Sequence, residues 1–257
     1  MKEHIKSESS AGVLTLTLFR PDKKNALTNE MYGAMADAIE QAKSDSAVRV
    51  VLVQAEGETF CAGNDIGEFA AVAAGMAPGE RHVMRFLHAL ARATLPLVAA
   101  VQGRAVGVGT TMLLHCDFVI LADDALLSTP FVGLALVPEA ASSLLMPARI
   151  GHVRAFEMFA LGEAVDASAA VAWGLANKTV PRKILHAEAR QVAERIAMQP
   201  AGALRAAKRL MRDPDILTAR MAAEGEIFAQ RLQSAEAREA FRAFAERRPP
   251  DFSKLAG

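Results

Sequence analysis

The sequence carries one chemically suggestive carboxylate, Glu139, inside the apolar run LVPEAASSLLM (residues 136–146). Moving an unpaired carboxylate out of water costs so much free energy that the group usually takes up a proton instead. A glutamate kept in such surroundings is therefore a candidate acid or base. A structural interpretation also stands, because Pro138 and Glu139 suit the first turn of a helix, where a carboxylate gains typically about 0.3–1 kcal/mol from the helix dipole. Burial raises the pKa of such a group and a helix N-terminus lowers it, so the two effects oppose each other.

Two turns rich in small residues could supply backbone N–H groups. FCAGNDI (60–66) and GRAVGVG (103–109) each follow a predicted strand. Two such turns could aim two N–H groups at one oxygen, which is how an oxyanion hole is built. Close packing of a strand-to-helix turn explains the glycines of 103–109 equally well, and the spacing fits neither GxGxxG nor a GK[ST] motif.

Other reactive residue types form no recognised motif. Ser142 and Ser143 lack a GxSxG setting. His82 and His88 are too far apart to share the helix face that a zinc pair needs. The run HCD (115–117) joins a predicted helix to a predicted strand, which favours burial or a turn over metal binding. We expect no metal site.

Composition excludes several classes of partner. Lys plus Arg number 29 and Asp plus Glu number 29, so a net charge of zero predicts no strong attraction to nucleic acid or to anionic membranes. The two cysteines, Cys61 and Cys116, form no CxxC pair, which suits a reducing compartment without disulfides. A polar N-terminal stretch and the lack of any long apolar run predict a cytoplasmic protein.

The elements that must position these residues alternate between strands and helices. Strands are predicted at 13–19, 48–54, 97–102 and 117–122, and helices at about 28–43, near 80–93 and from about 107. This alternation is typical of an α/β fold with parallel strands. Residues 70–79, rich in Ala and Gly, are predicted to form a loop.

The chain after about residue 183 contains only helical patterns. Asp213 and Ser234 suit the start of two of these helices, the first with a Pro in its first turn. We therefore predict an α/β core over residues 1–183 and a helical C-terminal region over residues 184–257. Apolar stripes on such helices serve either core packing or subunit contact.

Five segments together resemble the enoyl-CoA hydratase/isomerase, or crotonase, superfamily. They are KNALTNEM (24–31), FCAGNDI (60–66), LVAAVQGRAVGVG (97–109), HCDFVILADDALLSTPF (115–131) and GEAVDASAAVAWGLANKTV (162–180). The resemblance covers about residues 10–200 in the family's order. It implies a crotonase-like spiral of strand-strand-helix (ββα) units with a helical C-terminal region that builds homotrimers or hexamers.

The resemblance also implies the chemistry. The substrate is a coenzyme A thioester, so coenzyme A enters with the substrate and no separate cofactor is expected. The thioester oxygen lies between two backbone N–H groups, which correspond here to those of Asn64 and Val108. The segments that line the path of coenzyme A correspond to Lys24, Ala26, Ala62, Asn64, Asp65 and Ile66.

The sequence departs from the hydratase pattern at two positions. Where hydratases carry two glutamates, this chain has Thr111 and Phe131, so addition of water is not expected. Glu139 instead matches the glutamate of a PEGCSS-like motif in the Δ3,Δ2-enoyl-CoA isomerase branch. We therefore expect Glu139 to be the single acid/base that moves a double bond, with an apolar wall formed by Phe131, Leu134 and Leu136.

Two alternatives remain. A protein of this fold that lacks both hydratase glutamates could bind acyl-CoA without turnover. A hydratase-like enzyme or another enolate reaction acting on a different acyl-CoA is also consistent with the superfamily, because one fold hosts many activities.

Overall fold

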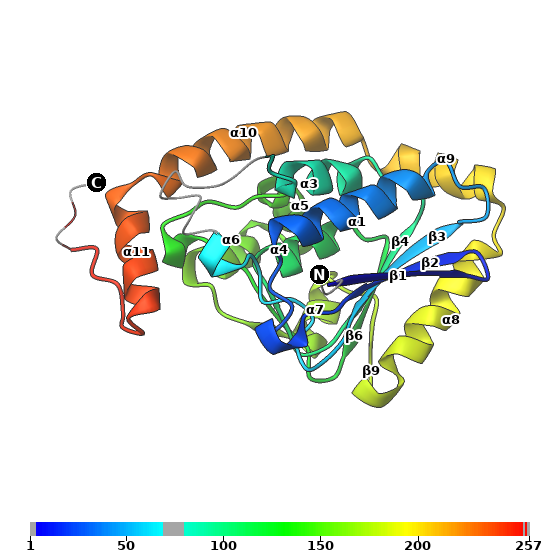
Figure 1. Cartoon of the computed structure of the whole chain (residues 1–257), viewed down its shortest axis with the longest axis horizontal. Helices are drawn as coiled ribbons and strands as arrows, with labels where there is room; N and C mark the ends of the chain where they lie inside the picture. The colour runs from blue at the N-terminus through cyan, green and yellow to red at the C-terminus, as the bar shows by residue number, and fades with distance from the viewer. Residues whose placement is uncertain (1–3, 69–79, 254, 256–257) are drawn as a thin grey trace.

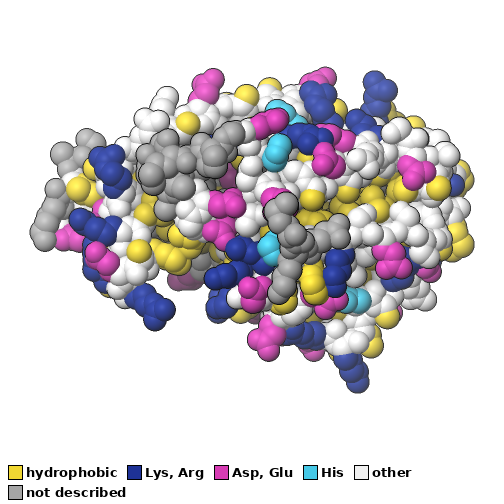
Figure 2. All heavy atoms as spheres, viewed as in Figure 1, with side chains coloured by type: hydrophobic (Ala, Val, Ile, Leu, Met, Phe, Trp, Pro, Cys, Tyr) yellow, Lys and Arg dark blue, Asp and Glu magenta, His cyan; other side chains and the backbone are white. Residues whose placement is uncertain are grey.

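The computed structural model describes residues 4–68, 80–253 and 255 (Figure 1). The loop predicted at 70–79 lies outside the described residues. Within the described ranges, no helix combines the length and apolar character needed to cross a bilayer. Acidic and basic side chains are interspersed over the face shown in Figure 2.

A six-stranded sheet forms the centre of the molecule, with the order β1-β2-β3-β4-β6-β9. The first two strands are antiparallel and every other pair is parallel. The bounds are β1 (Ile5–Ser10), β2 (Val13–Leu18), β3 (Val50–Ala55), β4 (Leu97–Val101), β6 (Phe118–Ala122) and β9 (Lys178–Val180). The four predicted strands are confirmed as β2, β3, β4 and β6.

Both faces of this sheet are covered, because successive side chains along a strand point to opposite faces. In β3, Val51 and Val53 belong to the larger core cluster, under α1 (Asn29–Ala42) and α3 (Val83–Ala91). Val50 and Leu52 face the smaller cluster, which α8 (Leu185–Ala197) closes. The helix α8 lies on the far side of the sheet from α1 and α3 (Figure 1). The helical region after residue 183 therefore shares its core with the sheet.

A second, three-stranded sheet has the order β5-β7-β8. Its strands are short, β5 (Arg104–Val106), β7 (Leu126–Ser128) and β8 (Val165–Asp166), and carry no run long enough to be recognised in the sequence. The helix predicted from about residue 107 is divided into α4 (Val108–Thr111) and a 3-10 turn, η2 (Met112–His115). Three more helices, α5 (Ser142–Ile150), α6 (His152–Leu161) and α7 (Ala167–Trp173), follow.

The C-terminal helices are α9 (Ala201–Met211), α10 (Pro214–Leu232) and α11 (Ala235–Ala245). The predicted caps are confirmed: Asp213 accepts the N–H groups of Asp215 and Ile216, and the Ser234 hydroxyl accepts that of Ala237 at 3.1 Å. In Figure 1, α10 runs along the top of the molecule, where it packs against α3 and α5.

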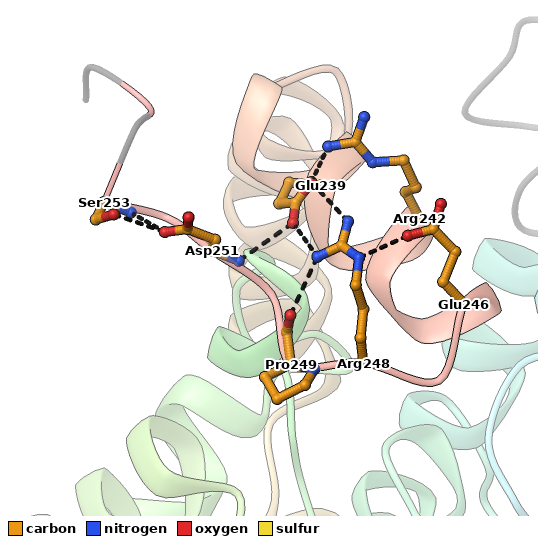
Figure 3. Close-up of polar contacts among 7 residues, drawn as sticks. All are labelled: Glu239, Arg242, Glu246, Arg248, Pro249, Asp251 and Ser253. Carbon is orange, nitrogen blue, oxygen red and sulfur yellow. Dashed lines mark hydrogen bonds and ion pairs between the residues drawn. The ribbon is translucent and has the colours of Figure 1, made fainter.

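The chain beyond α11 is tied back by one carboxylate (Figure 3). Glu239, only 6% exposed, pairs with Arg242 and with Arg248, whose Nη1 lies 2.6 Å from its Oε1, and accepts the Asp251 N–H at 3.2 Å. The hydrogen bond from Arg248 is the main reason that the pKa of Glu239 falls to about 2. The helix α11 in turn packs against the 3-10 turn η3 (Val132–Leu134).

Candidate active site

The two glycine-rich turns lie side by side and share backbone hydrogen bonds. The Cys61 N–H donates to the Arg104 carbonyl at 3.1 Å, and the Val106 N–H donates to the Cys61 carbonyl at 2.9 Å. A Cβ atom at Gly109 would lie 2.8 Å from the Cys61 carbonyl oxygen, which is closer than real contacts allow. Gly109 is therefore required for this close approach.

The backbone N–H groups of Asn64 and Val108 have no acceptor in the described part of the chain. Val108 is the first residue of α4, where an N–H has no partner within the helix. Asn64 follows Gly63, whose φ of +94° few other residues adopt. Hydrogen bonds from Leu27 N–H to the Gly63 carbonyl and from Asp65 N–H to the Leu27 carbonyl fix both sides of Asn64. That the N–H groups of Asn64 and Val108 together form an oxyanion hole remains a prediction.

A cavity of about 520 Å³ opens beside Asn64 and Glu139. Most of its wall is apolar and comes from two helices, with Val83, Met84 and Leu87 on α3 opposite Met221, Ala222, Gly225, Phe228, Ala229 and Leu232 on α10. Its polar lining consists of Asn29, Tyr32, Asn64, Asp65, Glu68, Arg81 and Glu139.

Three predicted site residues, Asn64, Asp65 and Glu139, line this cavity together. The described lining does not include the others, which are Lys24, Ala26, Ala62, Ile66, Val108, Phe131, Leu134 and Leu136. Phe131 is buried and its ring lies 6.2 Å from that of Phe159, and Leu136 is buried in the core. Most of the apolar lining of this cavity comes from α3 and α10, and an apolar wall formed by residues 131–136 stays a prediction.

Glu139 lies in an irregular stretch that precedes α5, which begins only at Ser142. The interpretation of Glu139 as a first-turn helix residue is therefore wrong. Its side chain is partly buried, and the Thr111 hydroxyl of α4 donates a hydrogen bond to its Oε1 at 2.5 Å. The next two residues, Ala140 and Ala141, both have positive φ, +61° and +56°.

Burial raises the pKa of Glu139 to about 7, and the negative charge of Glu224 acts in the same direction. The hydrogen bond from Thr111 opposes this shift, because it favours the ionised form. The pKa is therefore close to the value at which a carboxyl group can both accept and return a proton near neutral pH.

The sequence did not reveal two further polar residues at the site. Tyr32 on α1 is buried, and its hydroxyl donates to Asn64 Oδ1 at 2.5 Å. Burial raises the pKa of Tyr32 well above its usual value. Glu224 on α10 is 6% exposed and accepts two backbone N–H groups from the start of α5. A signal for Glu224 existed, because it lies at helical spacing from Leu217, Met221 and Phe228 and so interrupts an apolar stripe.

The run HCD (115–117) has the structural role that its position favours. His115 is fully buried, its Nε2 hydrogen-bonds to the Ala140 carbonyl at 2.8 Å, and Arg212 donates to its Nδ1. Burial lowers the pKa of His115 to about 3. Asp117 pairs with Lys208 at 2.6 Å, and both cysteines are free and buried. Within the described ranges, no group of His, Cys, Asp and Glu has the arrangement of a metal site.

Comparison with known proteins places the chain in one family. The chain belongs to the enoyl-CoA hydratase/isomerase family, which matches residues 8–255. The 1,2-epoxyphenylacetyl-CoA isomerase of Escherichia coli (strain K12) is 33% identical over 260 residues, covering 98% of this chain and 99% of that protein. Enoyl-CoA delta isomerase 2 of Rattus norvegicus is 34% identical over 208 residues, covering 79% of this chain and 53% of that protein. Other relatives carry hydratase names.

A solved structure from Pseudoalteromonas atlantica T6c, described as an enoyl-CoA hydratase/isomerase, superimposes with a TM-score of 0.93. It is 40% identical in sequence, and the match covers 97% of this chain and all of that one. The predicted α/β fold with a helical C-terminal region is thereby confirmed. The chain is an enzyme of the enoyl-CoA hydratase/isomerase family.

Proposed function

We propose that the protein is an isomerase that moves the double bond of a 3-enoyl-CoA thioester to the 2-trans position, with Glu139 as the single acid/base. The observation that carries this proposal is the pair Thr111 and Glu139. Thr111 stands where hydratases carry a glutamate, and its hydroxyl donates to the one carboxylate in the cavity whose pKa is raised to about 7. Addition of water needs a second carboxylate that this arrangement does not supply.

The two other carboxylates that line the cavity are engaged elsewhere. Asp65 forms an ion pair with Arg20 at 2.7 Å, and this contact helps to hold its pKa below the usual value against burial, which raises it. Glu68 is exposed and accepts the Asn29 N–H at 2.7 Å. Glu139 is partly buried, and its pKa is raised to about 7.

The proposed reaction moves one proton and one double bond. The Glu139 carboxylate removes a proton from C2, and the electron pair spreads into a dienolate whose negative oxygen accepts hydrogen bonds from the N–H groups of Asn64 and Val108. Each such donor contributes on the order of 2.7–4 kcal/mol in other enzymes. Protonated Glu139 then returns the proton to C4, which leaves the 2,3 double bond conjugated with the thioester carbonyl.

The apolar wall between α3 and α10 suits an acyl chain and excludes water from the dienolate. The path of coenzyme A is proposed to follow Lys24, Ala26, Ala62 and Ile66, which flank the turn that carries Asn64. The names of two relatives, an epoxyphenylacetyl-CoA isomerase and an enoyl-CoA delta isomerase, support an isomerase.

The test uses purified protein, a 3-enoyl-CoA and absorbance in the conjugated-enoyl band. Glu139→Gln is expected to lower turnover by at least about 10²-fold, the usual contribution of a general acid/base, while binding of a saturated acyl-CoA stays within about twofold. Glu226→Gln is the matched control, because Glu226 is exposed on α10. Full activity of Glu139→Gln would refute the proposal, and binding without turnover in the wild type would favour the acyl-CoA-binding alternative. Loss of the enoyl band from a 2-enoyl-CoA would indicate a hydratase.

We also propose that the protein acts as a homotrimer or hexamer in a reducing compartment such as the cytoplasm. Val153, Phe156 and Leu161 of α6 are 78%, 63% and 67% exposed, and large exposed apolar side chains of this kind mark protein contacts. The mass of the purified protein in solution tests this assembly.

A further inference from the structure

Glu224 lies on a part of the chain far from Glu139 in sequence, yet it holds the turn that follows Glu139. Its Oε2 accepts the Ala141 N–H at 2.6 Å, and its Oε1 accepts the Ser143 N–H at 2.9 Å. Each oxygen thus accepts one backbone N–H, as the two oxygens of a carboxylate can. Ala141 is the N-cap residue of α5 and has no side chain that could cap it. Glu224 thus caps α5 from a different helix.

The turn needs such a clamp because its backbone is strained. Ala140 and Ala141 are successive residues with left-handed φ, which alanine adopts only when the surroundings impose it. His115 holds the Ala140 carbonyl on one side, and Glu224 holds the Ala141 and Ser143 N–H groups on the other. A third contact, from Thr111, fixes the carboxyl group of Glu139 itself.

We propose that Glu224 is a positioning residue for Glu139: its carboxylate clamps the turn over residues 140–143 and so fixes the direction in which Glu139 faces the cavity. The proposal rests on the proposed role of Glu139 as the acid/base. Because α10 also supplies one wall of the cavity through Met221, Gly225 and Phe228, Glu224 links the fit of the acyl chain to the placement of the base.

Several charged side chains lie near Glu139. The titratable and charged groups around it and around Glu224 are Tyr32 from α1, Cys61, Asp65 and Glu68 from the segment beside the cavity, Arg81 before α3, His115 from η2, and Arg220 and Glu224 from α10. Asp65 is paired with Arg20. Burial raises the pKa of Tyr32 and that of Cys61, the latter to about 12, and lowers that of His115 to about 3, so these three are neutral. Burial is the main cause of the raised pKa of Glu139, and the negative charge of Glu224 adds to it. Burial also raises the pKa of Glu224, and the hydrogen bonds from Ser143 and Ala141 oppose that shift.

Two substitutions separate the charge of Glu224 from its geometry. Glu224→Gln removes the negative charge and replaces one acceptor by an amide donor, whereas Glu224→Asp keeps the charge and shortens the reach. Glu226→Gln, on the exposed side of the same helix, is the control. The Glu139 carboxyl carbon is followed by 13C NMR in the full-length protein without substrate, with its signal assigned through Glu139→Gln.

Glu224→Gln is expected to lower the midpoint of the Glu139 titration by about 0.5–1 pH unit, as expected for the loss of one partly screened like charge. Glu224→Asp is expected to leave this midpoint close to the wild-type value, because the negative charge at position 224 is kept. It should lower kcat about tenfold with KM little changed, because the Glu139 carboxylate is moved from its position. Glu226→Gln should change neither quantity.

An unchanged Glu139 midpoint in folded Glu224→Gln, or wild-type kcat in Glu224→Asp, overturns the proposal. If Glu224→Gln does not fold, as judged by circular dichroism, the kcat and KM of Glu224→Asp decide. The NMR midpoint needs no turnover, so a failure of the proposed isomerase activity would be seen separately, as an inactive wild type in which the midpoint still shifts.

Discussion

At the scale of single residues, the site depends on how one carboxyl group is kept near its point of half-ionisation. Burial and the charge of Glu224 raise the pKa of Glu139, and the hydrogen bond from the Thr111 hydroxyl lowers it. The balance, at about 7, leaves both the ionised and the protonated forms populated near neutrality. A relay that takes a proton from one carbon and returns it to another needs both forms in turn.

Thr111→Val should raise the pKa of Glu139 further, because the substitution removes a hydrogen bond that favours the carboxylate. The acidic limb of kcat/KM against pH is then expected to move to higher pH by about 0.5–1 unit. The conservative variant Thr111→Ser keeps the hydroxyl, so its acidic limb of kcat/KM should lie at the same pH as in the wild type. If the acidic limb of Thr111→Val also lies at the wild-type pH, the hydrogen bond from Thr111 does not set the ionisation of Glu139.

At the scale of elements, the site is built where two turns meet at the edge of β5. The contact between them depends on Gly109, which faces the Cys61 backbone. Gly109→Ala should destabilise the protein by about 1–3 kcal/mol, because the new methyl group must push the two turns apart. It should also lower kcat, since the same shift separates the N–H groups of Asn64 and Val108.

Gly202→Ala is a matched control for this change. A Cβ at Gly202, in helix α9, meets nothing within 4 Å. The same substitution should there leave the free energy of unfolding unchanged or raise it by up to about 1 kcal/mol, because alanine favours a helix over glycine. Urea unfolding followed by circular dichroism measures both. Equal effects at the two positions would contradict the close approach of the turns.

The main elements could be predicted from the sequence where the pattern is local. The strands β2 and β3 are rich in Val, Leu and Thr, which favour strands, and both are almost fully buried. The caps Asp213 and Ser234 have the residue types that helix starts favour. The short strands β5, β7 and β8 could not be predicted, because pairing with distant segments, rather than their own sequence, makes them strands. The order of the strands in the sheet could not be predicted from the sequence either, and only the structure shows it.

The candidate site was predictable in part for the same reason. Glu139 stood out as a charge in an apolar run, and Glu224 breaks the apolar stripe of α10 in the same way. Tyr32 gave no such signal, since a tyrosine on the buried face of a helix is compatible with an ordinary core. The contribution of α3 and α10 to the cavity lining could not be predicted, because nearness in sequence to Glu139 does not indicate it, and a wall formed by Phe131, Leu134 and Leu136 stays a prediction.

At the scale of the whole molecule, Glu139 makes stability depend on pH. Its folded pKa, about 7, lies above its ordinary value of 4.5, so the folded state keeps a proton that the unfolded chain loses between these pH values. The free energy of unfolding therefore falls as pH rises through this window. Allowing for partial exposure of the side chain, the loss is about 2 kcal/mol, complete above the folded pKa.

Glu139→Gln removes this titration and should be more stable than the wild type at pH 8, with the difference disappearing below about pH 4.5. Thermal unfolding of both proteins over a series of pH values measures it, and the difference curve cancels every other titrating group. Parallel curves, with a constant gap at all pH values, would show that Glu139 titrates in the folded protein as it does in the unfolded chain.

Helix α10 carries both the cavity wall and the clamp on the turn after Glu139, and this has a consequence for how substrate range can change. A substitution at Met221, Gly225 or Phe228 that admits a different acyl chain also shifts the backbone that carries Glu224. A substitution on α10 that changes the acyl-chain specificity is therefore expected to lower kcat as well, because it also moves Glu139. The effect of such a substitution then depends on the residues that position Glu139. Val83, Met84 and Leu87 of α3 line the opposite wall without holding the turn, and divergence in chain length is better tolerated there.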